Sequence, residues 1–276
     1  SNAAVRMEGK NALLNVVYDL PAGNQYCVDY KIYPDGVVNV AVKFTATDQE
    51  AVKTDVPEDT HLATYTPSKK KEKKDNLEVP RIGIRFHIPQ DMNMVEYFGR
   101  GPEENYIDRN AGSMVGRYKT IADSMYVDYV RPQENGHRTD TRWVVLSDKS
   151  GRGLLVQADK TIGFNALKNT IEDFDAEDSS RPYQWRNRSP EEIENHDLDE
   201  AKNAMRKMTH VNDIIPRDFV EVSVDMKQQG VAGYDSWGAK VQPGYTIPAN
   251  QNYEWGFTFV PIRAKADVDK SLRYDY

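Results

Sequence analysis

Residues 28–44 read VDYKIYPDGVVNVAVKF, and this stretch decides the fold. Val28, Tyr30 and Ile32 alternate with polar residues, and apolar residues alternate again after the turn Pro34-Asp35-Gly36. Because successive side chains of a strand point to opposite faces, this period of two predicts two strands, each with one buried face. The turn residues between them predict a β-hairpin.

The same period recurs along the chain and predicts an all-β fold. Alternating apolar residues run from Ile82 to Ile88 and from Val220 to Met226, and shorter apolar runs occupy 143–146 and 154–156. The 16 tyrosines and the many valines are residue types that fit a pleated surface. Many strands with one buried face predict a large sandwich or barrel.

One helix is expected among the strands. Ser189 supplies a capping hydroxyl, Pro190 suits the first helical position, and Glu192 completes a capping box. Good helix formers follow, so the sequence predicts a short helix near 190–206.

The domain organisation is simple. Ser1-Asn2-Ala3 resembles the remnant of a cleaved expression tag. Residues 4–276 are expected to form one domain, because no linker rich in Gly or Pro divides them. The basic run 69–74 and the acidic stretch 172–178 are interpreted as solvated surface segments.

The composition excludes several classes of function. The 36 basic and 43 acidic residues give a net charge of −7, so nucleic acid is not an expected partner. No run approaches the roughly 20 apolar residues that span a bilayer, so no membrane partner is expected either. The single Cys27 cannot form an intrachain disulfide, and a cytoplasmic and a periplasmic location both stay open.

Residue spacing alone indicates no catalytic centre. The five histidines lack the i, i+4 spacing with which two imidazoles share a metal ion, so no metal site is predicted. No glycine-rich phosphate loop or nucleophile elbow is present. Adjacent acids such as Glu103 and Glu104 point to opposite sides of an extended chain, so no catalytic pair of carboxylates is assigned.

Three stretches resemble one family. Residues 97–109 read YFGRGPEENYIDR, residues 129–138 read YVRPQENGHR, and residues 225–238 end in DSWG. In the same order, they resemble motifs in the C-terminal domain of bacterial β-galactosidases of glycoside hydrolase family 2. The resemblance covers most of the chain, from about Val28 to Phe259.

The resemblance implies a fold and a partner. The family's domain is a large antiparallel β-sandwich (supersandwich) similar to galactose mutarotase. In the family, a separate (β/α)₈ barrel carries both catalytic glutamates, so this chain alone is expected to be inactive and to act with a barrel domain or large subunit. The parent would be a homo-oligomer that hydrolyses terminal β-galactosides with retention. Any Mg²⁺ and Na⁺ would lie on its barrel, with no cofactor in this domain.

The resemblance also implies a sugar contact. The family's domain lends one tryptophan to the sugar site, and that residue corresponds to Trp237 here. A flat indole offers an apolar face to the C–H face of a pyranose. Asp235 and Ser236 are expected to support the loop that presents it, because short polar side chains tie turns through local backbone bonds.

A second group of residues has two interpretations. Glu134, His137, Glu103 and Asn105 lie in the family motifs and are candidates for a sugar-contacting groove. The structural interpretation is the stronger one, because Gly and Asn favour tight turns and acids beside arginines fix loops by charge-assisted bonds.

The chain departs from the family in the absent barrel and in one further respect, and two alternatives stay open. The family's domain begins further upstream with an Arg-x-Pro-x-Asn-Asp-like run that this chain lacks, so its first strands are expected to be missing. One alternative is a free-standing aldose epimerase with His137 and Glu134 as its acid–base pair. The other is a non-catalytic galactoside-binding subunit.

Overall fold

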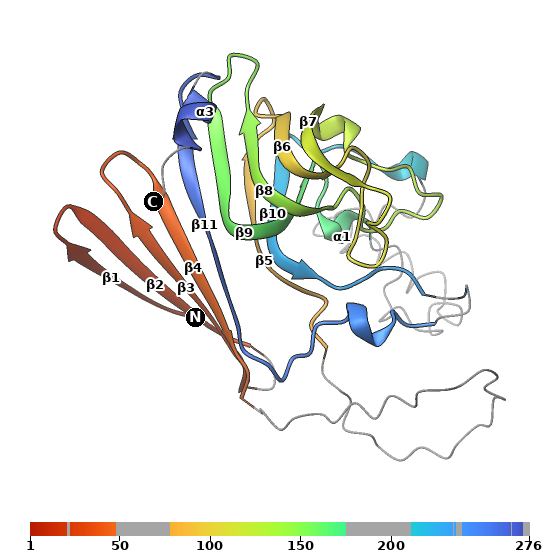
Figure 1. Cartoon of the computed structure of the whole chain (residues 1–276), viewed down its shortest axis with the longest axis horizontal. Helices are drawn as coiled ribbons and strands as arrows, with labels where there is room; N and C mark the ends of the chain where they lie inside the picture. Colours follow the sequence, from red (N-terminus) through yellow and green to blue (C-terminus); the bar gives the residue numbers. More distant parts are fainter. Residues whose placement is uncertain are drawn as a thin grey trace, which may run out of the picture.

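The chain folds almost entirely into antiparallel β-sheet, as its computed structural model shows (Figure 1). The structure describes residues 1–20, 23–47, 78–174, 211–233, 235, 239–265 and 267–272. The predicted all-β class is confirmed, and the architecture is consistent with the predicted sandwich.

The regular elements are mostly strands. The strands are β1 (Asn2–Glu8), β2 (Asn11–Asp19), β3 (Gln25–Ile32), β4 (Val38–Thr45), β5 (Arg81–Pro89), β6 (Met94–Gly101), β7 (Met114–Ile121), β8 (Arg138–Ser147), β9 (Gly153–Leu167), β10 (Phe219–Gln228) and β11 (Tyr253–Ile262). The helical elements are α1 (Ile171–Phe174), α3 (Asp267–Ser271) and the 3₁₀ turns η2 (Ala122–Ser124), η4 (Val211–Asp213) and η5 (Pro243–Tyr245).

All these strands join one sheet that turns at β9. The main path runs β1-β2-β3-β4-β11-β9-β8-β6-β7, and β10 pairs with both β9 and β5. The first part of β9 pairs with β11 at Gly153–Ala158, and its last part pairs with β10 at Gly163–Leu167. β9 bends between these two partners (Figure 1), which brings β10 and β5 across the other strands.

The main core lies between these two parts of the sheet. Phe86 of β5 meets Phe259 of β11 edge-on, with 5.3 Å between ring centroids. Tyr26 of β3 donates to the carbonyl of Gly83 in β5 at 3.0 Å. Because β5 pairs with neither β3 nor β11, these contacts join two layers, as the faces of a sandwich do.

The hairpin predicted from residues 28–44 is confirmed as β3 and β4. Its strands pair from Ile32↔Val38 outward, and Gly36 occupies the left-handed region with φ 88°. Asp35 accepts from the backbone N–H of Val37 at 3.1 Å, which closes the turn locally. The predicted strands around 82–88 and 220–226 are likewise present, as β5 and β10.

A smaller apolar cluster occupies the other face of the sheet. Trp143 and Val145 of β8 point away from the main core and pack with Leu155 and Ile262. Val268 of α3 is buried in the same cluster. The short helix α3 therefore covers an apolar patch that the alternation of β8 creates.

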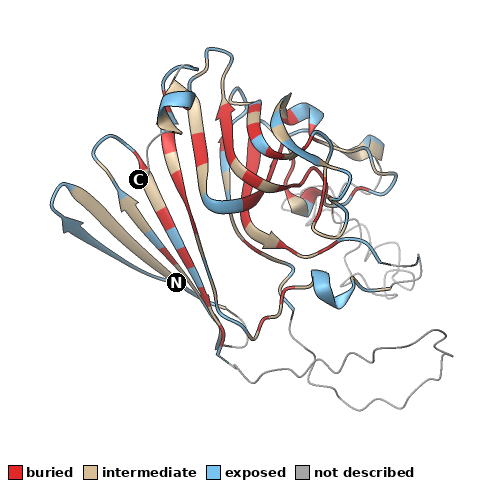
Figure 2. Cartoon of the chain, viewed as in Figure 1, coloured by how far each residue is buried: buried red, intermediate tan, exposed pale blue. Residues whose placement is uncertain are grey.

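The hairpin of β1 and β2, called the outer hairpin below, contributes little to either core. It forms the free edge of the sheet and projects from the rest of the molecule (Figures 1 and 2). Every residue of β1 is exposed, including Val5 and Met7 at 70% and 67%. Asn2 and Ala3, interpreted as a tag remnant, pair with Val17 and Val16 of β2.

Several predicted features lie outside the described residues. These are the helix near 190–206, the basic run 69–74, most of the acidic stretch, Ser236 and Trp237. Within the described ranges, no helix combines the length and apolarity needed to cross a membrane.

Candidate functional site

The two motifs at 97–109 and 129–138 lie side by side. The backbone N–H of Asn105 donates to the carbonyl of His137 at 2.8 Å. The carboxylate of Glu104 accepts from the N–H of Gly136 at 2.7 Å. We call the buried network around Glu104, Asn105 and His137 the clasp, because it joins two loops that are distant in sequence.

Asn105 is fully buried and uses its whole side-chain amide within the clasp. Its Nδ2 donates to the carbonyls of Arg100 and Glu103 at 3.1 and 3.0 Å. Its Oδ1 accepts from the N–H of Thr139 at 3.0 Å and from the hydroxyl of the same residue at 2.5 Å. An amide engaged in this way holds loops together, so the geometry favours the structural interpretation of Asn105.

Glu104 is the acid at the centre of the clasp, and the sequence analysis did not select it. Besides Gly136, its carboxylate accepts from Arg109 at 2.6 Å and from the hydroxyl of Tyr129. The guanidinium of Arg109 also lies 4.7 Å from the ring centroid of Tyr106. The sequence signal for Glu104 was its place in the motif at 97–109, directly before Asn105. Glu103, the other acid, is exposed.

His137 is an interior residue of the clasp rather than an open base. Its side chain is 2% exposed, and its ring stacks on Tyr106 with 5.4 Å between centroids. Asn165 donates to the carbonyl of Asn135 at 2.5 Å, which leaves its Oδ1 to accept from His137 Nδ1 at 2.7 Å. Burial, together with the positive charge of Arg81, lowers the pKa of His137 from 6.5 to about 3, so the imidazole is neutral.

Arg81 links the clasp to β10. Its guanidinium pairs with Glu134 and donates to Gln228 at 2.6 Å. Its Nε lies 3.2 Å from Oδ2 of Asp225, but the two are not aligned for a hydrogen bond. Asp225 is fully buried, and among the described residues its carboxylate oxygens have no hydrogen-bond partner. Burial raises the pKa of Asp225 from 3.8 to about 7, although Arg81 acts in the opposite direction.

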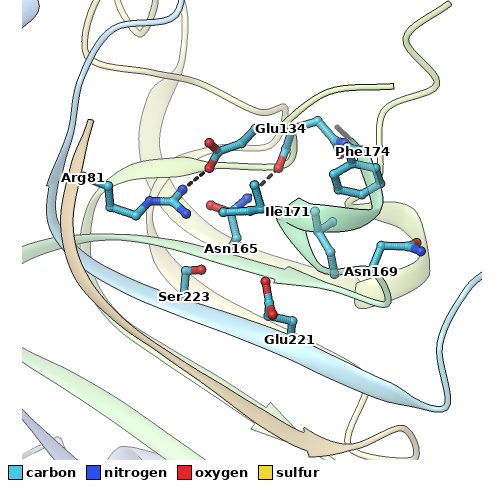
Figure 3. A pocket seen from close by; sticks show the side chains of 10 residues that line it. Arg81, Glu134, Asn165, Asn169, Ile171, Phe174, Glu221 and Ser223 are labelled. Atoms are coloured by element: carbon cyan, nitrogen blue, oxygen red, sulfur yellow. Dashed lines mark hydrogen bonds and ion pairs between the residues drawn. The ribbon is translucent and has the colours of Figure 1, made fainter. Parts of the chain in front are cut away.

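A small hollow opens beside Arg81. Figure 3 shows Glu134, Asn165, Glu221 and Ser223 around it, with Arg81 turned toward Glu134. The space enclosed by the hollow is only about 10 Å³, room for roughly one water molecule. Pockets that bury a small molecule typically measure roughly 300–1,000 Å³, so the hollow is too small to enclose a sugar by itself. Within the described ranges, no three His, Cys, Asp or Glu side chains gather as a metal site.

The third motif begins in β10 and continues into the next loop. Asp235 is exposed and accepts from the backbone N–H of Ala239 at 3.1 Å, the kind of local bond expected of it. Asp108 accepts from the N–H of Ala232 at 2.8 Å, a contact that sequence reasoning missed. The bond of Asp108 holds the chain before Trp237, and the bond of Asp235 joins residues before and after it; Trp237 itself lies outside the described residues.

Fold and site together define an all-β domain whose motif residues mainly hold loops against one another. The family model described as "Beta galactosidase small chain" matches residues 2–259. The chain therefore belongs to the β-galactosidase small-chain family.

Individual relatives agree with this family. A β-galactosidase of Priestia megaterium is 35% identical over 185 residues, which are 67% of this chain and 15% of that protein. A β-galactosidase of Halalkalibacterium halodurans is 29% identical over 231 residues, 83% of this chain and 18% of that protein. A β-galactosidase of an Arthrobacter species is 37% identical over 103 residues, 36% of this chain and 10% of that protein. The chain thus spans less than a fifth of the relatives that it matches.

Proposed function

We propose that this chain completes the sugar-binding site of a β-galactosidase whose catalytic residues lie on a separate barrel. The observation that carries the proposal is its family membership together with the small share of each relative that it covers. The parent would hydrolyse terminal β-galactosides with retention, which requires two carboxylates roughly 5 Å apart. The proposal holds whether the barrel lies on the same polypeptide or on a large subunit.

The chemistry of the clasp supports placing catalysis elsewhere. Glu104 is neutralised by Arg109, and Glu134 is neutralised by Arg81. Carboxylates held in such pairs fix loops, and neither is free to protonate a leaving group. The chain alone is therefore expected to leave a β-galactoside intact.

The same geometry gives no support to the aldose-epimerase alternative. A ring-opening acid and base must both face the sugar within hydrogen-bonding reach. His137 is 2% exposed and donates to Asn165, while Glu134 pairs with Arg81. This pair therefore cannot reach a sugar in the described arrangement.

Within the proposed function, Trp237 is the residue that touches the sugar. Replacing Trp237 by Ala in the complete β-galactosidase should lower kcat/KM for a chromogenic β-galactoside by about tenfold or more, equivalent to about 1.4 kcal/mol of transition-state binding. Trp237→Phe should retain part of the activity, because a smaller ring still offers an apolar face. Steady-state kinetics of the three enzymes measures both effects.

The control is an exposed aromatic residue outside the three family motifs. Tyr18 lies on the outer hairpin, is 42% exposed, and should give wild-type kinetics as Tyr18→Ala. The isolated chain serves as the blank. Equal kcat/KM for wild type and Trp237→Ala would reduce the domain to a scaffold.

A further inference from the structure

Asp108 connects two motifs that lie far apart in sequence. Its Oδ2 accepts from the backbone N–H of Ala232 at 2.8 Å, across a separation of 124 residues. Gly230 lies against the same carboxylate, because a Cβ at that position would be 2.5 Å from Asp108 Cγ. The chain leaving β10 therefore passes directly over the Asp108 side chain, at a position where only glycine fits.

The chain from Gly230 onward contacts later residues at two points. Gly230 donates to the carbonyl of Tyr245 at 2.9 Å. Further along, Gly233 and Ala239 lie so close that a Cβ on Gly233 would collide with the Ala239 carbonyl. Asp235 adds its bond to the N–H of Ala239. Asp108 thus contacts the chain just before Gly233, which itself lies against Ala239.

Asp108 is itself held by the clasp. The N–H of Arg109 donates to the carbonyl of Tyr106 at 2.8 Å and closes a turn around residue 108. Tyr106 is buried and stacked on His137, so this turn rests on the interior of the domain. Among the described residues, the second carboxylate oxygen of Asp108 is buried without a hydrogen-bond partner, which leaves Ala232 as the contact that this side chain serves.

We infer that Asp108 is a positioning residue for the sugar site, because it fixes the chain that leads into Trp237. The inference rests on the proposed function of Trp237. Trp237 lies five positions after Ala232 in the chain, a reach of at most roughly 18 Å, so a shift at Ala232 is transmitted over a short distance. A displacement of about 1 Å at a positioning contact can lower the rate as much as 100-fold.

The experiment is a double-mutant cycle in the complete β-galactosidase, measured as kcat/KM on a chromogenic β-galactoside. Asp108→Ala should lower kcat/KM by about tenfold while the enzyme stays folded. In a background that already carries Trp237→Ala, Asp108→Ala should change kcat/KM by less than about twofold, because two residues that act through one contact are not additive. A purely structural role would give the same factor in both backgrounds.

Two further variants test the mechanism. Asp108→Asn retains an acceptor for the Ala232 N–H and should restore most of the lost kcat/KM. Gly230→Ala places a methyl group against the carboxylate and should reproduce the kinetics of Asp108→Ala. If Asp108→Ala does not fold, the same kcat/KM measurements are made on Gly230→Ala instead. Asp35→Ala is the matched control, because Asp35 also accepts a backbone N–H, but in the distant β3–β4 turn.

The outcomes separate the two proposals. If Trp237→Ala has wild-type kcat/KM, the proposed function fails, whatever Asp108 does. If Trp237→Ala is impaired and the anchor variants match wild type, the role of Asp108 is overturned and the proposed function stands. Multiplicative losses in the double variant overturn the inference as well.

Discussion

The clasp and the outer hairpin each contain an asparagine with a hydrogen-bonded side chain, but the surroundings of the two residues differ. Asn105 in the clasp is fully buried and makes four side-chain hydrogen bonds. Asn15 in β2 donates one bond to Asp29 at 2.7 Å, in an exposed position. Water can replace the bond of Asn15 but not those of Asn105, so only the clasp needs its polar side chain to keep the fold.

The main core and the outer hairpin differ in the same way in their apolar residues. Val224 of β10 is fully buried in the main core, whereas Val5 of β1 is 70% exposed. Both residues belong to regular antiparallel strands. Backbone pairing is therefore common to both regions, and the difference in stability comes from what the side chains touch.

The same substitution in both regions should sharpen this comparison most. Asn105→Ala should lower the free energy of unfolding by about 3 kcal/mol, because several buried backbone groups lose their partner. Asn15→Ala should change it by less than about 0.5 kcal/mol. Urea denaturation of the two variants, followed by circular dichroism, measures the difference. Equal effects would show that the clasp is not needed for stability.

Valine truncation is the second comparison. Val224→Ala should cost about 2 kcal/mol, from lost apolar burial and the cavity that remains. Val5→Ala should again stay within about 0.5 kcal/mol. The midpoint of urea unfolding, with an unchanged slope, reports both values. A loss at Val5 as large as that at Val224 would mean that the outer hairpin is packed in solution.

Strands were predictable where apolar residues alternate with polar ones over a long run of sequence. The period of two located β3, β4, β5 and β10, because alternation follows directly from burial on one side. The outer hairpin was missed for the converse reason. Residues 2–8 are exposed throughout, so no alternation marks them in the sequence.

The clasp could be predicted only as motifs. Its bonds join residues far apart in the chain, as between Asn105 and Thr139 or Asp108 and Ala232. Local patterns carry no information on such pairs, and the sequence does not show which groups Glu104 contacts. The resemblance identified the right stretches, whereas the role of each side chain emerged only from the contacts.

Two buried ionisable groups, His137 in the clasp and Asp225 beside it on β10, have effects on stability of opposite sign. The pKa of Asp225 is raised in the folded state. Its contribution to the free energy of unfolding is therefore fully present below about pH 4 and is lost as the pH rises toward 7. The pKa of His137 is lowered in the folded state. Its contribution to the free energy of unfolding is therefore present above about pH 6.5 and is lost as the pH falls toward 3.

Between about pH 4 and 6.5 these two contributions oppose each other, so wild-type stability should vary little with pH in that window. Asp225→Asn removes one of them, and its stability relative to wild type should rise by about 1 kcal/mol or more as the pH is raised through the window. His137→Asn should show the reverse, with stability relative to wild type rising as the pH is lowered. Urea unfolding of each variant at several pH values measures the slopes. Parallel pH profiles for all three proteins would mean that neither group is buried as described, and the clasp would then be as solvated as the outer hairpin.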